Sequence, residues 1–298
     1  LDDNNAILKG YNNGELDFIE NLPVDEIPTY LASGELEIGD YLGTYYVCFN
    51  TEDEVFSDPN IRKAFSLVID RNYIVENVSQ AGEVPADGYV PNGVNDAAGA
   101  GSDDFRTVGG SYYSISEEDY EKNCEEARQL LADAGYPNGE GFPQIEYTTN
   151  DAGYHKVVAE YLQQAWGELG INVEVNIVEW SSFTPMRRNG EYMVARNGWV
   201  GDYSDPSNML DLFCTGNGNN DGKFSNADFD AAMEKAASTM DTAERSAALH
   251  EAEDVLMEQV GCIPVAYYND FWLQSEKITG IWHSAYGYWY FMYGDIAE

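Results

Sequence analysis

Apolar and polar positions switch between strand-like and helix-like periods through most of the chain. Residues 43–50, "GTYYVCFN", are aromatic and β-branched, which suits a strand. The segment "DPNIRKAFSLVIDRNYIVENV" that follows places apolar residues at helical spacing. Asp58 and Pro59 occupy the cap and the first helical position, and Asp70 is placed to cap a second helix. This part of the chain therefore predicts a strand followed by two helices.

Residues 81–116 have no clear period and are rich in Gly, Ser, Asp and Pro, so we expect a long irregular loop of the kind that often lines sites. A helix is predicted to begin after Ser116, which forms with Asp119 a pattern that resembles a capping box. Gly135 is predicted to end this helix, with Pro137 just beyond.

The rest of the chain repeats this alternation. Further strands are predicted at 145–149, 171–180, 191–199, 262–268 and 270–275, and further helices at 154–169, at 183–188 and twice within 226–260. Gly170 is expected to close one helix, Asn226 to cap another, and Asp241 or Thr242 to separate the last two. Strands that alternate with helices predict an α/β fold, and neither a repeat nor a dividing linker is visible.

The net charge of the chain limits the classes of partner that it can bind. Among 298 residues there are 15 Lys and Arg against 53 Asp and Glu, which gives a formal net charge of -38. Nucleic acid and anionic membrane surfaces are repelled by such a field, whereas cationic solutes are attracted. A saline habitat would also fit this acidity. No run of 18 apolar residues exists, so no transmembrane helix is predicted.

Two smaller features add to this picture. The chain starts Leu1-Asp2-Asp3-Asn4, without an initiator methionine or a signal-like apolar segment, so we expect a fragment or a processed chain. The four cysteines form no CxxC pair, which argues against zinc and thioredoxin-like chemistry. We expect buried free thiols.

Four stretches together carry a family resemblance. They are "DPNIRKAFSLVIDRNYIV", "EEARQLLADAGYPNGEGFP", "LGINVEVNIVEWSSF" and "ARNGWVGDYSDP". In this order they resemble the C-terminal half of the family 5 extracellular solute-binding proteins, the peptide-binding components of ABC importers. "NADFDAAMEKA" and "CIPVAYYNDFWL" continue the resemblance over nearly the whole chain.

The resemblance implies a type II periplasmic-binding-protein fold, an α/β fold in which two lobes close on a ligand. Residues 1–46 are then a remnant of lobe 1, residues 47–262 are lobe 2, and residues 263–298 return to lobe 1. Members of the family carry a further segment ahead of this portion. The strands that cross between lobes hold Cys48 and Cys262, so these two are expected to be neighbours, and a disulfide between them stays open.

A peptide offers an ammonium group, a carboxylate and the amides between them. A buried aspartate suits the ammonium, arginine or histidine suits the carboxylate, and strand backbone can pair with the amides. The resemblance assigns the ammonium to Asp202, in "GWVGDY", and the carboxylate to Arg196, with His155 as a second candidate.

The resemblance also implies further contacts with the ligand. Trp180 would wall a side-chain pocket, Arg187 (or its neighbour Arg188) would lie near it, and Gly198 would leave its backbone open beside Trp199. Each of these residues also has an ordinary structural explanation, as a turn cap, an ion pair, core or surface. Some relatives bridge two cysteines at the positions of Gly43 and Val200, and this chain cannot form that bridge.

The implied function is delivery of peptides, oligopeptides above all, to the permease subunits of an ABC transporter. The protein would then be a monomer outside the cytoplasm, in the periplasm or held by a lipid anchor on a preceding segment, with no cofactor and no enzymatic activity. Residues 1–298 by themselves are expected to bind peptides weakly, because half of the clamp is absent.

Three alternatives stay open. The family also includes sugar-, nickel- and haem-binding members, and the 13% aromatic content suits sugar stacking. Residues 217–228, "NGNNDGKFSNAD", half match a calcium-binding loop. Abundant carboxylates could serve a glycoside hydrolase, but no nucleophile elbow, HExxH motif or phosphate loop is present.

Overall fold

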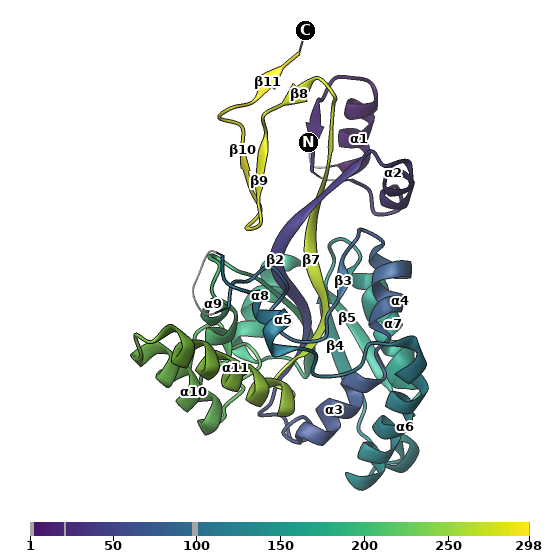
Figure 1. Cartoon of the computed structure of the whole chain (residues 1–298). Helices are drawn as coiled ribbons and strands as arrows, with labels where there is room; N and C mark the ends of the chain where they lie inside the picture. Colours follow the sequence, from purple (N-terminus) through teal and green to yellow (C-terminus); the bar gives the residue numbers. More distant parts are fainter. Residues whose placement is uncertain (1–2, 21, 97–100, 298) are drawn as a thin grey trace.

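The computed structural model describes residues 3–20, 22–96 and 101–297. A mixed sheet in the order β1-β7-β2-β6-β4-β5, with β3 against β7, forms its centre (Figure 1). Its strands are β1 (Phe18–Ile19), β2 (Leu36–Phe49), β3 (Val84–Pro85), β4 (Ile145–Asn150), β5 (Val173–Val178), β6 (Val194–Val200) and β7 (Ile263–Gln274). β4 lies parallel to β5 and β6, while β2 lies antiparallel to β6 and β7. The predicted α/β fold is confirmed.

Helices cover both faces of this sheet. They are α1 (Asn4–Asn12), α2 (Ile27–Ser33), α3 (Pro59–Leu67), α4 (Arg71–Tyr73), α5 (Phe105–Gly109), α6 (Glu117–Asp133), α7 (His155–Gly167), α8 (Trp180–Asn189), α9 (Pro206–Leu210), α10 (Ala227–Ser238) and α11 (Thr242–Glu258). A π-helical turn (Ile74–Ser79) follows α4, and 3-10 turns lie at Pro137–Gly139 and Asp211–Phe213. No helix in the described residues is both long and apolar enough to cross a bilayer.

The side chains of β2 alternate between two cores. Tyr45, Val47 and Phe49 pack with residues of α3, α6 and α7, whereas Tyr46 and Cys48 pack with residues of α10 and α11. Successive residues of a strand point to opposite faces, so one strand serves both layers. The core is therefore a helix–sheet–helix sandwich centred on β2.

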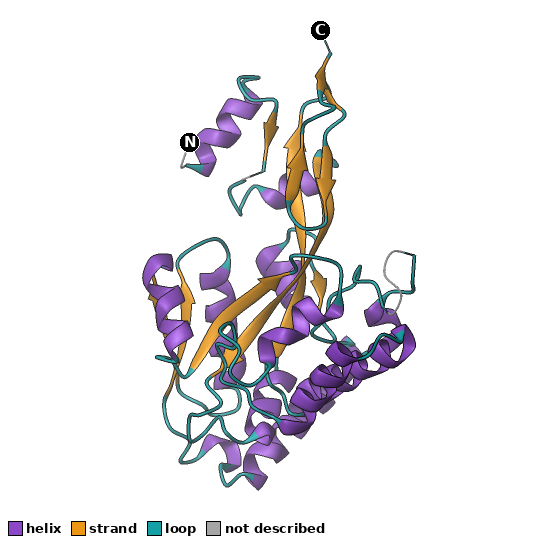
Figure 2. Cartoon of the chain, turned by 90° about the vertical axis from the view of Figure 1, so that its left-hand side faces the viewer, coloured by secondary structure: helices purple, strands orange, loops and turns teal. Residues whose placement is uncertain are grey.

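Two long strands leave this body. β2 and β7 run side by side from the larger lower part into a narrow upper part that holds α1, α2 and the C-terminal strands (Figures 1 and 2). These C-terminal strands are β8 (Ile278–Thr279), β9 (Trp282–Ser284), β10 (Tyr288–Tyr290) and β11 (Asp295–Ile296). The two strands predicted at 262–268 and 270–275 are one continuous strand, because β2 pairs with β7 across both segments.

The predicted helix starts are confirmed by their cap bonds. Asp58, Asp70, Asn226 and Asp241 each accept backbone N–H groups at a helix start. Ser116 caps α6 by accepting from the Glu118 N–H.

The capping box at α6 does not close, since Asp119 accepts from the Ser114 hydroxyl at 2.6 Å instead of reaching back to Ser116. Gly135 follows the helix in the left-handed region, at φ +97°. Gly170 lies beyond the end of α7, which stops at Gly167, so this helix is shorter than predicted.

The crossing strands bring the expected cysteines together. Val47 pairs with Ile263, which places Cys48 beside Cys262 in continuing register. Both are free thiols, as are Cys124 and Cys214. Burial raises the pKa of Cys48 to about 11, so its thiol stays protonated at neutral pH.

The predicted loop at 81–116 contains β3 and α5, and its residues 97–100 lie outside the described part, as do Leu1 and Asp2 at the start of the chain. β2 contains a bulge, because its register against β7 shifts between Asp40 and Thr44. The shift lies where β2 stops pairing with β6, because Gly43 is the first residue of β2 in that pairing.

Candidate functional site

Arg196 lies on β6 and forms no ion pair with any residue that the structure describes. Its guanidinium carbon is 5.3 Å from the centre of the Tyr45 ring, and Nη2 donates to the Tyr268 hydroxyl at 3.3 Å. Its Nε is buried and has no hydrogen-bond partner among the described residues. None of the ion pairs in the described part of the chain involves Arg196. A shielded guanidinium of this kind is suited to an incoming carboxylate.

His155 lies beside the same tyrosine, Tyr45, as Arg196. It is the first residue of α7, and its ring centre lies 5.5 Å from that of Tyr45 and 5.2 Å from that of Tyr154. Its Nδ1 is buried and has no partner in residues 3–20, 22–96 and 101–297. Burial, and then the charge of Arg196, lowers the pKa of His155 to about 3, so the ring is neutral.

The N-terminal end of α7 also favours an anion beside Arg196 and His155. The N-terminus of a helix carries partial positive charge and free N–H groups, which favour a negative group. The two residues predicted to bind the carboxylate therefore meet beside Tyr45, with the N-terminal end of a 13-residue helix next to them. Sequence reasoning missed the surrounding tyrosines, since strand patterning marks them only as core.

Gly198 has a packing role that the sequence does not reveal. It pairs with Tyr45 across β2 and β6, and a Cβ placed on it would collide with the Tyr268 hydroxyl. The glycine thus makes room for the tyrosine that contacts Arg196. An open approach of a ligand to its backbone stays a prediction.

Asp202 lies in the bend that follows β6. Its N–H donates to Asn208 Oδ1 at 2.8 Å, and its side chain is exposed. Among the described residues, the side chain takes part in no hydrogen bond and no ion pair. The turn itself is capped by Asp205, which accepts from Ser207 N–H and pairs with Arg245 at 2.8 Å. Capping therefore does not account for Asp202.

Arg187 is occupied within the fold. Its Nε donates to Asp221 at 2.7 Å, and both side chains are buried. Its Nη1 donates to the carbonyl of Arg196 at 3.1 Å. The pair therefore braces the strand that carries Arg196. Asp221 was missed from the sequence because it lies in a turn-like Asn/Gly segment. A direct contact between Arg187 and a ligand stays a prediction.

The two predicted tryptophans differ in exposure. Trp180 begins α8, is 49% exposed, and its ring centre lies 6.1 Å from that of Phe183. Trp199 is half-buried against the α10–α11 core, and its Nε1 donates to Asn208 at 3.4 Å. Trp180 therefore has a free face for a ligand, and Trp199 supports the Asp202 bend.

The two positions of the absent cysteine bridge do face each other. Gly43 pairs directly with Val200, so the predicted relationship between these positions is confirmed. A Cβ on Gly43 would lie 2.5 Å from the carbonyl oxygen of Trp199. The bend before Asp202 is thus packed tightly against β2 without a covalent bridge.

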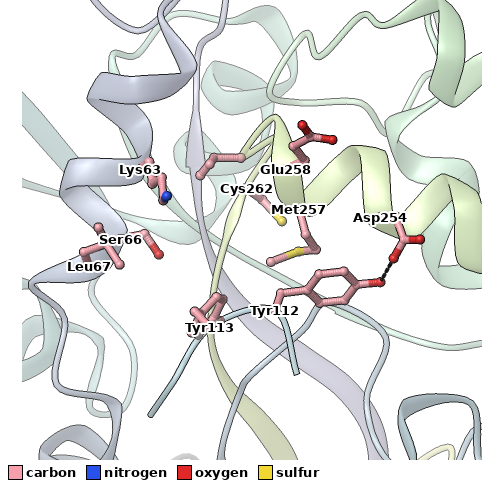
Figure 3. Close-up of a pocket in the computed structure, with 10 residues that line it drawn as sticks. Lys63, Ser66, Leu67, Tyr112, Tyr113, Asp254, Met257, Glu258 and Cys262 are labelled. Atoms are coloured by element: carbon pink, nitrogen blue, oxygen red, sulfur yellow. Dashed lines mark hydrogen bonds between the residues drawn. The ribbon is translucent and has the colours of Figure 1, made fainter. Parts of the chain in front are cut away.

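A separate cavity of about 380 Å³ lies between α3 and the end of α11 (Figure 3). Tyr112 donates to Asp254 at 2.8 Å on one side of it, and Lys63 on the other side pairs with Glu126 at 2.7 Å. None of the predicted site residues lines this cavity. It is therefore distinct from the place where Arg196 and His155 meet.

The described residues give no support to the calcium-binding alternative for residues 217–228. No group of three or more His, Cys, Asp or Glu side chains there is placed to hold a metal ion. In the loop at 217–228, Asp221 is taken by Arg187, and the amide of Asn220 donates to the Phe224 carbonyl at 2.7 Å.

Comparison with known families decides the relationship. Residues 1–221 match the model described as bacterial extracellular solute-binding proteins, family 5 Middle. The chain belongs to this family. The predicted resemblance is thereby confirmed over most of the chain.

Individual relatives of this family 5 chain agree. It is 31% identical to the oligopeptide-binding protein OppA of Bacillus subtilis (strain 168) over 94% of this chain and 51% of that protein. It is 31% identical to the periplasmic oligopeptide-binding protein OppA of Escherichia coli (strain K12), over 91% and 48%. The chain thus spans about half the length of these relatives.

Solved structures show the same fold. Haemophilus influenzae OppA in complex with RPPGFSPFR matches with a TM-score of 0.81 and 26% identity, over 99% of this chain and 57% of that one. The murein tripeptide binding protein MppA of Escherichia coli matches with a TM-score of 0.82 and 27% identity, over 98% and 56%. The predicted type II periplasmic-binding-protein fold is confirmed.

Proposed function

We propose that this chain forms one wall of a peptide-binding cleft in an extracytoplasmic protein that delivers peptides to an ABC transporter. The observation that carries the proposal is the shielded Arg196 beside His155, on the strand that leads to Asp202. Within the described part of the chain, neither Arg196 nor the Asp202 carboxylate has an ion-pair partner. The OppA and MppA relatives are peptide-binding proteins, which supports the same ligand class.

In this proposal each charged end of the peptide binds a residue of the opposite charge. The carboxylate accepts hydrogen bonds from Arg196 and, in the Nδ1–H tautomer, from neutral His155 at the start of α7. The ammonium donates to Asp202. Side chains between them are free to differ, and the open face of Trp180 offers an apolar surface to one of them.

The proposed cleft lies between two lobes. Residues 47–262 form one lobe, and residues 1–46 and 263–298 contribute to the other, with β2 and β7 as the crossing strands. Closure of the lobes would exclude water from the charges on Arg196 and Asp202 and so strengthen both contacts. In this role the protein is a monomeric binding protein without enzymatic activity, and its partners are the permease subunits.

The test is Asp202→Asn in the intact protein, with binding of tetrapeptides measured by calorimetry. We expect a loss of about 2–5 kcal/mol for a peptide with a free ammonium, because the charge-assisted bonds are lost. An N-acetylated peptide should bind the two proteins equally. Asp25→Asn, at another exposed aspartate, is the matched control and should leave affinity unchanged.

Two results would overturn the proposal. One is equal affinity of Asp202→Asn and the unsubstituted protein for free peptides. The other is thermal stabilisation by oligosaccharides but by none of a panel of di- to pentapeptides, since stabilisation follows ligand occupancy. The second result would favour the sugar-binding alternative.

A further inference from the structure

A groove of about 500 Å³ is lined by residues of α2 and of the segment from α4 to β3. Its apolar walls come from both sides, with Pro28 and Leu31 on α2 and Val75 and Pro85 opposite. Its acids, Glu76 and Glu83, both lie on the side opposite α2. No Lys or Arg is among the residues that line it. The groove therefore offers apolar contact along its walls and negative charge without a balancing cation.

Glu83 is the fixed acid of this groove. Its side chain is buried to all but 9%, and Oε2 accepts from the Ser79 hydroxyl at 2.8 Å and from the Ala81 N–H at 3.2 Å. None of the ion pairs among residues 3–20, 22–96 and 101–297 includes Glu83. A shielded carboxylate held in one orientation favours a cation that can reach it.

The groove adjoins the site of Arg196. The turn that carries Glu83 contacts β7 on both sides of Tyr268, because the Ala81 carbonyl accepts from Asn269 and Val84 pairs with Tyr267. Tyr268 is the residue whose hydroxyl accepts from Arg196. The acid of the groove and the proposed carboxylate-binding Arg196 are thus linked through neighbouring residues of β7.

We propose that this groove receives a lysine or arginine side chain from the C-terminal end of a bound peptide. The inference rests on the proposed function, because the peptide carboxylate at Arg196 and His155 brings the adjacent side chain to the groove. Its aliphatic stem lies along Leu31, Val75 and Pro85, and its charged head bonds to Glu83. Long basic side chains combine these two properties.

The experiment uses alanine tetrapeptides with lysine or norleucine at the last or the second-last position. Norleucine keeps the stem and removes the charge. At 150 mM salt we expect lysine to bind about tenfold more tightly than norleucine at one of the two positions, as for a hydrogen bond to a charged group. Equal affinities at both positions would overturn the inference.

Two glutamates separate a specific contact from the general acidity of the protein. Glu83→Gln should abolish the preference for lysine while keeping the bonds to Ser79 and Ala81. Glu76→Gln is the matched control, because Glu76 is exposed at the same groove, and it should keep the preference. A preference that survives Glu83→Gln, or is lost equally in both variants, would contradict a role for Glu83.

Leu31→Arg provides a second test that leaves the Glu83 turn untouched. Leu31 is 39% exposed on α2, so the substitution can bring a guanidinium to the groove without opening the core. We expect it to remove the lysine preference, and an unchanged preference would count against the inference.

Failure of the inference and failure of the proposed function give different results. If lysine and norleucine peptides bind equally and Asp202→Asn weakens both, only the groove assignment is wrong. If none of the tetrapeptides binds the intact protein, the peptide-binding proposal falls and the groove assignment falls with it.

Discussion

Arg187 and Asp221 form a buried ion pair with 2.7 Å between Nε and Oδ2. Asn197 also donates to this carboxylate oxygen, at 3.2 Å, and Arg187 donates to the Arg196 carbonyl. Arg187 and Asp221, which are 34 positions apart in the sequence, thereby hold the consecutive β6 residues Arg196 and Asn197 in place. The strand can then present Arg196 to the opposite face of the sheet, where no described residue forms an ion pair with it.

Loss of this ion pair should destabilise the fold. We expect Asp221→Ala to lower the free energy of unfolding by about 3–5 kcal/mol, because it leaves a buried guanidinium without its partner. Urea unfolding measures the change. Glu160→Ala removes a partner of the exposed Lys156 and is the control, with a loss below about 1 kcal/mol. Equal losses in the two variants would contradict a structural role for the buried pair.

Removal of the Arg196 charge should change which peptides bind. In the intact protein, Arg196→Met should weaken a tetrapeptide with a free carboxylate by about 2–5 kcal/mol. The C-terminally amidated peptide should lose far less, because it offers no negative charge. Calorimetry with both peptides gives the comparison. If the variant weakens both by the same amount, Arg196 supports the cleft and does not read the carboxylate.

The packing of Gly198 can be tested with a pair of substitutions. Gly198→Ala should cost about 1–3 kcal/mol of folding stability, because its methyl group needs the space of the Tyr268 hydroxyl. Tyr268→Phe removes that hydroxyl, so the double variant should recover more than half of the loss. Thermal and urea unfolding of all four proteins complete the cycle. Additive losses would show that the two residues do not compete for this space.

His155 should make folding stability depend on pH. Its pKa is lowered from 6.5 to about 3 in the folded state, so between these values the unfolded chain binds a proton that the folded protein does not. This histidine therefore lowers stability as the pH falls from about 6.5 toward 3.

The variant His155→Phe should lose less stability than the unsubstituted protein when unfolding is compared at pH 7 and pH 5. Both proteins share every other titrating group, so the difference between them isolates the histidine. A parallel decline of the two would mean that His155 is protonated in the folded state.

Features that depend on neighbouring residues could be predicted from the sequence alone. Asp58, Asp70 and Asn226 cap helices because a short polar side chain reaches the next N–H groups whatever surrounds it. The alternation of strand-like and helix-like periods likewise predicts an α/β fold. The motif around Arg196 and Asp202 was one of the four stretches whose order pointed to the family.

Long-range pairing decided the rest. Arg187 and Arg196 are equivalent cations in the sequence, and only the fold gives the first a carboxylate partner and leaves the second without one among the described residues. Two predicted strands merged into β7 because β2 pairs with both. The collision between Gly198 and Tyr268 has the same origin. Burial and charge compensation depend on residues that are distant along the chain, and local patterns carry no information about which of them will meet.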